Sequence, residues 1–178
     1  MRRWWRIDPW GPRQALSGLM LVVGLVMAVT LVAAVLETLT TRRVGLESAL
    51  GMVGALALMT VWLTLVARFY LVGIYVNDRG VQMRYTFSNR TLPWSQVAGF
   101  EVRAAEFLGE PTVRDACWVR TAGGAVETPV QRRSRATGWR KNVGPVLRTE
   151  EFDRVVARLD AELAAARQGQ AGGGVVLR

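Results

Sequence analysis

Histidine is absent from this chain of 178 residues, and cysteine occurs once, as Cys117. Without histidine, neither a Ser-His-Asp triad nor a Cys-His pair can form, so the common routes to an activated nucleophile are excluded. A single cysteine has no partner for an internal disulfide, which is typical of a chain that faces a reducing compartment. Cys117 falls in a segment of alternating hydrophobicity, where a cysteine is more often a small core residue than a reactive thiol.

Motifs for metals and nucleotides are missing as well. The sequence has no CxxC pair and no dense cluster of carboxylates, so we expect no metal site. No segment resembles the glycine-rich loops that hold phosphates in nucleotide-binding folds. We therefore expect no cofactor and no enzymatic activity.

Charged residues are absent from two long apolar runs, residues 15–36 and 48–67. At about 1.5 Å per helical residue, each run reaches about 30 Å, the thickness of the hydrocarbon core of a bilayer. The sequence therefore predicts a hairpin of two transmembrane helices within residues 15–68. A cleaved signal peptide fits poorly, because the first run exceeds the roughly 7 to 15 apolar residues of such a signal and a second run follows. Since neither run contains an ionisable residue, we interpret the hairpin as an anchor rather than a transport path.

Basic residues flank the two runs unevenly. Arginine or lysine beside a span resists translocation, so the side that carries more of them faces the cytoplasm. Seven arginines precede the first run or follow the second, and two lie between the runs: Arg2, Arg3, Arg6, Arg13, Arg68, Arg79 and Arg84 against Arg42 and Arg43. This contrast predicts that both termini face the cytoplasm.

The first 14 residues form a basic leader that is rich in tryptophan. Trp4, Trp5 and Trp10 stand among arginines, and Pro9 and Pro12 oppose a regular helix through the segment. Tryptophan rings favour the headgroup layer and arginine favours anionic lipid, so we interpret the leader as an interface anchor. The alternative is a solvated tail.

Each apolar run also holds one pair of small residues four positions apart, Gly24 with Ala28 and Gly51 with Ala55. Such pairs let two helix backbones approach closely. They could pack the hairpin internally or join two copies of the chain.

From residue 69 onward the hydrophobic period is that of a strand. Val81, Met83, Tyr85 and Phe87 alternate with polar residues, which predicts a strand that buries one face. Six strands are expected in all, with a seventh candidate at residues 143–147. The six are residues 69–76, 81–87, 91–94, 99–103, 116–121 and 125–130.

Turn residues separate these strands. Residues 77–80, Asn-Asp-Arg-Gly, predict a tight turn in which Gly80 takes a positive φ, and Gly123-Gly124 predicts a hairpin. Thr149 then begins an amphipathic helix with acidic residues in its first turn. Its apolar positions have helical spacing: Phe152, Val155, Val156, Leu159 and Leu163. The tail after Gln168 lacks any period, and we expect it to be flexible.

Three short segments carry a resemblance to a known family: GIYV at 73–76, DRGV at 78–81 and TLPWSQVAGF at 91–100. Together with the strand layout and the closing helix, they resemble the bacterial PH-like (pleckstrin-homology-like) domain of small actinobacterial membrane proteins. The resemblance covers about residues 10–165.

This resemblance implies an α+β fold, in which a two-helix transmembrane hairpin is followed by a small antiparallel β-barrel or sandwich capped by a C-terminal helix. It implies a multi-pass protein of the bacterial cytoplasmic membrane, without a settled ligand and without catalytic residues to carry over. We divide the chain into a leader (1–14), the hairpin (15–68), the PH-like domain (69–166) and a tail (167–178). Trp94, in the most specific segment, is expected to fill the core or cover an end of the barrel, with ligand contact as the alternative.

Residues 131–148 form the most basic segment of the domain. They contain no acidic residue, and their candidate contacts with anionic lipid or a partner are Arg132, Arg133, Arg135, Trp139, Arg140, Lys141 and Arg148. Residues 69–148 hold twelve basic and six acidic residues, so this segment supplies the whole positive excess. Three interpretations stay open: a solvated charge run, attraction to anionic headgroups, and binding to an acidic partner, of which nucleic acid fits least because one aromatic is interleaved.

These observations lead to one main hypothesis and one alternative. The main hypothesis is a non-enzymatic, membrane-anchored PH-like binding module at the cytoplasmic face, which docks on anionic lipid or a partner through the basic segment. The alternative is a small structural subunit of a larger membrane complex, in which a partner protein or a second copy contacts the spans.

Overall fold

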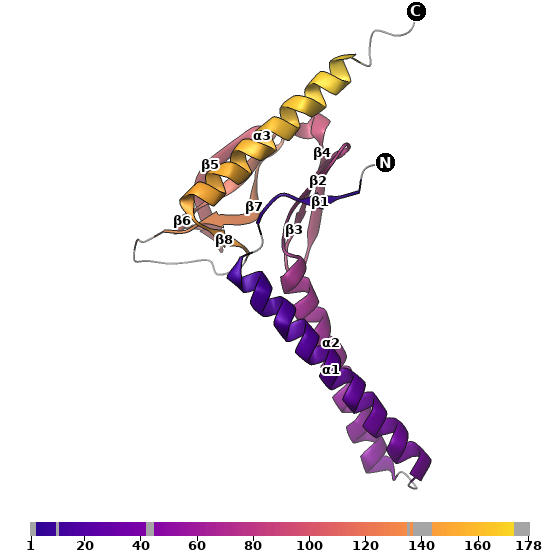
Figure 1. The fold of residues 1–178 in the computed structure, drawn as a ribbon. Coiled ribbons are helices and arrows are strands. Elements are labelled where there is room, and N and C mark those ends of the chain that lie inside the picture. Colours follow the sequence, from indigo (N-terminus) through magenta and orange to yellow (C-terminus); the bar gives the residue numbers. More distant parts are fainter. Residues whose placement is uncertain (1–2, 10, 42–44, 135, 137–143, 173–178) are drawn as a thin grey trace, which may run out of the picture. The chain divides into compact units, whose positions relative to one another are not determined.

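The computed structural model describes residues 3–9, 11–41, 45–134, 136 and 144–172, and it divides the chain into two compact units (Figure 1). One unit is Pro12–Tyr70, and the other combines Met1–Gly11 with Leu71–Arg178. The segment before the hairpin therefore belongs to the same unit as the segment after it.

The Pro12–Tyr70 unit is a pair of helices, α1 (Pro12–Thr41) and α2 (Leu46–Leu71). The stretches Gln14–Thr41 and Leu46–Leu71 are long and apolar enough to cross a membrane. Hydroxyl groups inside them bond to the helix itself, since Thr38 Oγ1 donates to Ala34 O at 2.8 Å and Thr60 Oγ1 to Leu56 O at 2.8 Å. This pairing suits an apolar surrounding, where an unpaired polar group is costly.

The two small-residue pairs of the hairpin differ in their surroundings. A Cβ atom added at Gly24 would overlap the indole ring of Trp62, so this glycine makes room for an internal contact between α1 and α2. At Gly51 an added Cβ would meet nothing within 4 Å. Gly24 of the first pair thus serves internal packing of the hairpin.

The second unit contains two four-stranded sheets and one long helix. Sheet A has the order β1-β2-β3-β4, all antiparallel: β1 (Trp5–Arg6), β2 (Gly73–Asn77), β3 (Gly80–Arg84) and β4 (Asn89–Pro93). A 3-10 turn, η1 (Trp94–Gln96), leads to sheet B, of order β5-β6-β7-β8: β5 (Val97–Phe107), β6 (Glu110–Thr121), β7 (Gly124–Arg132) and β8 (Val146–Leu147). The β7–β8 pair is parallel and the other pairs of sheet B are antiparallel. Helix α3 (Thr149–Gly172) follows, which confirms the α+β fold that the sequence predicts.

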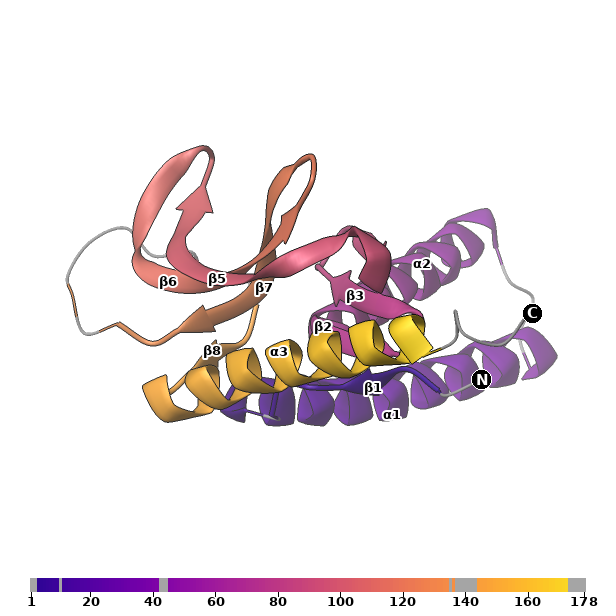
Figure 2. The same cartoon turned by 90° about the horizontal axis from the view of Figure 1, so that it is seen from above.

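One hydrophobic core joins both sheets to α3. Figure 2 shows the ribbons of the two sheets and of α3 from above. The helix side chains of the core are Phe152, Val155, Leu159 and Leu163, so the predicted apolar face of the helix is confirmed. Trp94 is also buried there, and its indole Nε1 donates to Asn77 O at 2.9 Å, as expected of a structural tryptophan. Cys117 lies in the same core, as a small apolar residue would.

Several predicted strand bounds were wrong. Residues 69–71 belong to α2, because this apolar and aromatic stretch continues the helix of the preceding run, and β2 begins only at Gly73. Strand β3 ends at Arg84, so Phe87 lies in a turn and is 82% exposed instead of buried. At the C-terminus, α3 continues to Gly172, past the expected end near residue 166.

The prediction of a positive φ at Gly80 was also wrong. The described glycines with positive φ are Gly109, Gly124 and Gly144. Gly80 is needed for a different reason: a Cβ atom there would overlap the backbone carbonyl of Leu92 in the neighbouring strand β4. The turn is instead held by Asn77, whose Oδ1 accepts the amides of Arg79 and Gly80 at 2.9 and 3.1 Å.

Candidate functional site

The leader is part of the domain, a feature that sequence analysis missed. Strand β1 pairs with β2, with Trp5 opposite Val76 and Arg6 opposite Tyr75. Ile7 then enters the core, and its amide donates to Ile74 O at 3.0 Å. A two-residue strand has too short a pattern to be recognised, so no period in the sequence indicates it.

A buried ion pair fixes the leader to the start of β2. Arg6 and Asp8 form a salt bridge whose side chains are 9% and 0% exposed. Arg6 Nη2 also donates to Val72 O at 3.0 Å, and Asp8 Oδ1 accepts the amide of Ile74 at 2.8 Å. Gly73 permits this approach, because a Cβ atom there would lie 2.6 Å from Asp8 Oδ1.

The electrostatics of Asp8 reflect two opposed effects. Burial raises the pKa of its carboxyl group above the ordinary value, while the hydrogen bond and the charge of Arg6, together with the amide of Ile74, oppose the rise. The negative charge of the buried Asp8 carboxylate is therefore compensated by the positive charge of Arg6. We call the Arg6–Asp8 pair, with its bonds to Val72 and Ile74, the clamp. It joins the chain segment that leads into α1 to the segment that follows α2.

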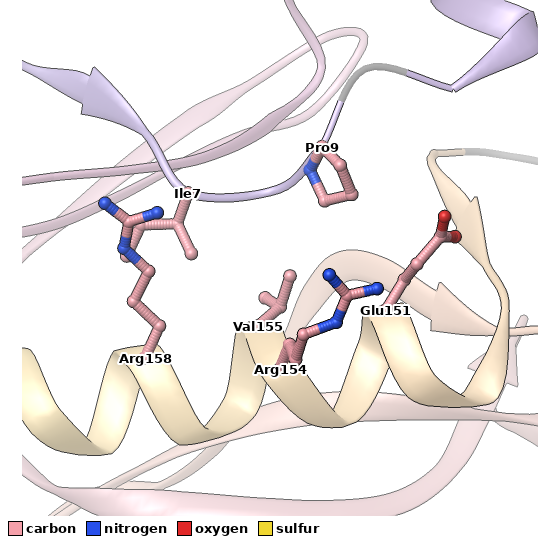
Figure 3. A pocket seen from close by; sticks show the side chains of 6 residues that line it. All are labelled: Ile7, Pro9, Glu151, Arg154, Val155 and Arg158. Atoms are coloured by element: carbon pink, nitrogen blue, oxygen red, sulfur yellow. The ribbon is translucent and has the colours of Figure 1, made fainter.

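Beside the clamp, a groove of about 420 Å³ lies between the leader and the first half of α3 (Figure 3). Its walls are Ile7, Pro9, Glu151, Arg154, Val155 and Arg158. The side chains of Arg154 and Arg158 rise from the helix on the side that faces the leader, as Figure 3 shows. Both residues are exposed, and they stand four positions apart, so they share one face of α3.

The single acidic residue of the groove has a structural role. Glu151 Oε2 accepts the backbone amide of Arg148 at 3.1 Å, which caps the first turn of α3. Arg154 Nε donates to Glu150 O at 3.2 Å and keeps its remaining guanidinium donors for other partners. Two guanidinium groups beside an apolar wall can bind an anionic headgroup, since each offers several N–H donors and the wall accepts carbon.

The structure brings the two ends of the predicted basic segment together. The parallel β7–β8 pair sets Arg132 opposite Leu147, and the amide of Arg133 donates to Leu147 O at 2.7 Å. Arg133 and Arg148 are exposed at this point, next to the first turn of α3. The predicted contacts Arg135, Trp139, Arg140 and Lys141 lie outside the described residues.

Arg132 differs from the other basic residues of the segment. Its guanidinium forms a salt bridge with Asp115, and it lies 5.9 Å from the centre of the Phe152 ring. The guanidinium of Arg132 is therefore already bound to residues of the domain. Arg154 and Arg158, which sequence analysis did not single out, take its place as candidate contacts, and their spacing of four on the polar face of the helix is the signal that could have found them.

The tryptophans of the leader lie closer to the core than an isolated anchor would. Trp5 is half-buried on β1 and packs against the core, and Trp4 is half-buried beside it. Trp10 lies outside the described residues. Their role as an interface anchor stays a prediction.

Cys117 and the acidic residues offer little chemistry. Burial raises the pKa of the Cys117 thiol to about 12, with Asp160 adding to the rise and Thr128 opposing it. Among the described residues, no three His, Cys, Asp or Glu side chains gather as a metal site would require. The predicted absence of metal, cofactor and enzymatic activity stays a prediction.

These features define a class: a PH-like domain of two sheets and a closing helix, covalently joined to two helices of membrane-spanning length. Residues 73–162, about half of the chain, match the family model described as Bacterial PH domain, and the chain belongs to that family. Comparisons with curated proteins and with solved structures found no match. The bacterial PH-like resemblance is thereby confirmed, while the actinobacterial type stays a prediction.

Proposed function

We propose that this protein is a membrane-associated, non-enzymatic PH-like module that docks on anionic lipid headgroups at the cytoplasmic face. The observation that carries the proposal is the groove in which Arg154 and Arg158 face Ile7 and Pro9 of the leader. Pro9 precedes the first residue of α1, Pro12, by three positions, so chain connectivity keeps the groove close to the start of the apolar helix.

The charges beside the groove support the same function. Arg133 and Arg148 are exposed next to the first turn of α3, so described arginines continue from the groove to the basic segment. Each basic residue near an anionic leaflet contributes about 1 kcal/mol of attraction. Because the hairpin would tether the domain at an effective concentration in the millimolar range, weak contacts of this kind suffice.

The test uses the full chain in nanodiscs, one set of neutral lipid and one containing anionic phosphatidylglycerol. We expect slower hydrogen exchange of the amides in residues 148–158 in the anionic discs than in the neutral ones. Changing Arg154 and Arg158 together to Ser should remove that difference. Equal exchange in both lipids for the unchanged protein would refute the proposal.

A charge-matched control separates a local contact from net charge. Arg79 and Arg120 are both exposed; Arg79 lies in the β2–β3 turn, at the opposite end of β2 from Gly73, and Arg120 lies near the end of β6. The variant with Arg79→Ser and Arg120→Ser has the same net charge as the groove variant. We expect it to keep the dependence on anionic lipid, because neither residue lines the groove.

A further inference from the structure

The turn between β3 and β4 holds an exposed phenylalanine on a firmly fixed backbone. The amide of Tyr85 donates to Ser88 O at 2.8 Å, and the phenol of Tyr85 donates to the carbonyl of Glu127 in sheet B. Thr86 is buried, whereas the side chain of Phe87 is 82% exposed. The turn therefore exposes the phenyl ring of Phe87 on a backbone that these hydrogen bonds hold in place.

Few large apolar side chains of the domain are exposed. Outside α1 and α2, the large apolar side chains that are exposed among the described residues are Phe87, Val102, Phe107 and Leu108. A phenylalanine left in water forgoes about 1.5 to 3 kcal/mol of burial free energy. Contact of such a side chain with an apolar partner outside the domain would recover this free energy.

Sheet register shows which end of the domain carries the turn. Gly73 pairs with Arg84 and Arg84 pairs with Asn89, so the β3–β4 turn lies at the end of sheet A where β2 begins. Gly73 follows the last residue of α2, Leu71, by two positions. The leader leaves the sheet at the same end, because Asp8 contacts Ile74 and the chain then runs toward Pro12.

Chain dimensions limit how far the phenyl group can be from the apolar helix. The path from the Cα atom of Leu71 to that of Phe87 has three parts. It runs two residues along the chain to Gly73, across one strand spacing to Arg84, and three residues along the chain to Phe87. At about 3.5 Å per residue and 4.8 Å per strand spacing, this distance is at most about 23 Å. Both helix connections and the Phe87 turn thus share one end of sheet A.

The residues around the turn match the chemistry of a headgroup layer. The guanidinium of Arg84 lies 4.3 Å from the centre of the Tyr75 ring, and the Tyr75 hydroxyl donates to Leu71 O at 3.1 Å. Arg90 is exposed one residue into β4. Aromatic rings favour the region between water and hydrocarbon, and arginine favours the phosphates that lie there.

We propose that the β3–β4 turn, residues 85–88, inserts the ring of Phe87 into the headgroup layer of the bilayer that the hairpin spans. The occupant is lipid, because the turn shares its end of the sheet with both connections to the apolar helices. The insertion is a third attachment point besides the two covalent ones, and it sets the tilt of the domain. It is apolar, so it does not rest on the anionic headgroup contact of the groove.

Site-directed spin labelling of the full chain tests this proposal. In a Cys117→Ala background, Phe87→Cys carries the label, and Ser95→Cys is the control, since Ser95 is exposed in η1 at the other end of sheet A. Nanodiscs with one chain each exclude contacts between copies. We expect the ratio of oxygen to water-soluble nickel accessibility to be several-fold higher at position 87 than at position 95.

The lipid composition distinguishes this proposal from the proposed function. The high ratio at position 87 should occur in neutral and in anionic discs, whereas groove docking should require anionic lipid. Equal ratios at positions 87 and 95 would overturn the insertion, whatever the groove does. As a second readout that leaves Cys117 in place, Phe87→Ser should speed hydrogen exchange in residues 85–88 in discs, and an unchanged rate would also count against the insertion.

Discussion

The carboxylate of Asp8 accepts a hydrogen bond from the backbone amide of Ile74 at 2.8 Å, although 66 positions separate the two residues. The whole hairpin lies between them in the sequence. Together with strand β1, this contact makes the leader part of the same compact unit as the chain that follows the two apolar helices.

Replacing Asp8 should destabilise the domain strongly. Asp8→Ala leaves Arg6 without its carboxylate and the amide of Ile74 without its acceptor, both in a buried place. Removing one partner of a buried pair costs about 3 to 5 kcal/mol. We expect a clearly lower urea midpoint of the full chain in detergent, followed by tryptophan fluorescence, and little change for Asp153→Ala, which alters an exposed residue of α3.

The thiol of Cys117 should report unfolding. Its pKa is raised from 9.0 to about 12 in the folded chain, so at pH 8 the thiolate fraction is about a thousandfold lower than in the unfolded chain. A disulfide reagent should therefore label the protein rapidly only in urea. Rapid labelling of the native protein would show that Cys117 is not buried.

The same shift predicts a dependence of stability on pH. Since the pKa is raised in the folded state, the contribution of Cys117 to stability is intact below about pH 9 and is lost as the pH rises toward 12. The loss approaches about 1.4 kcal/mol per pH unit at most. Between pH 8 and 10.5 the urea midpoint of the parent should fall more than that of Cys117→Ala, and parallel curves would contradict the shift.

Trp94→Phe should cost about 1 kcal/mol, because it removes the bond from the indole to Asn77 O and leaves that carbonyl without this donor. Trp118→Phe is a matched control. Its indole nitrogen is buried with no hydrogen-bond partner among the described residues, so replacement removes no bond there. The expected order of unfolding midpoints is Trp118→Phe at or above the parent and Trp94→Phe below it.

Gly80→Ala should destabilise the β2–β3 hairpin, because the methyl group would overlap Leu92 O in a backbone that cannot yield easily. Overpacking of this kind costs about 1 to 3 kcal/mol. Gly123→Ala is the control, since the nearest atom to its added Cβ is 4.0 Å away. Equal urea midpoints for the two variants would show that β4 is able to move aside.

Within the hairpin, Gly24→Leu should displace Trp62 and lower the thermal midpoint of the helices, measured by circular dichroism in detergent. Gly51→Leu should leave that midpoint unchanged, because a Cβ atom added there meets nothing within 4 Å. The mass of the detergent-extracted particle is measured in parallel. A smaller particle for Gly51→Leu would show that this face joins copies of the chain and would favour the structural-subunit alternative.

Only part of the candidate site could be predicted from the sequence, because the contacts of a charged side chain depend on its neighbours in space. Net charge is visible in a sequence, so the basic segment was found, and its residues Arg133 and Arg148 are exposed. Whether an arginine is available depends on its neighbours, and the salt bridge of Arg132 with Asp115 comes from another strand. Phe87 was misplaced because its alternation with buried residues continues past Arg84, where β3 in fact ends.

The sequence by itself determined the two apolar helices, most of the strands, the apolar face of α3 and the family, because length, hydrophobic period and turn residues are local properties. Only the tertiary structure decided that the leader joins sheet A, that Gly80 is required by the backbone of Leu92, and that Arg154 and Arg158 face the leader across a groove. Those relationships join residues far apart in the chain, and they arise from packing, which no short window of sequence contains.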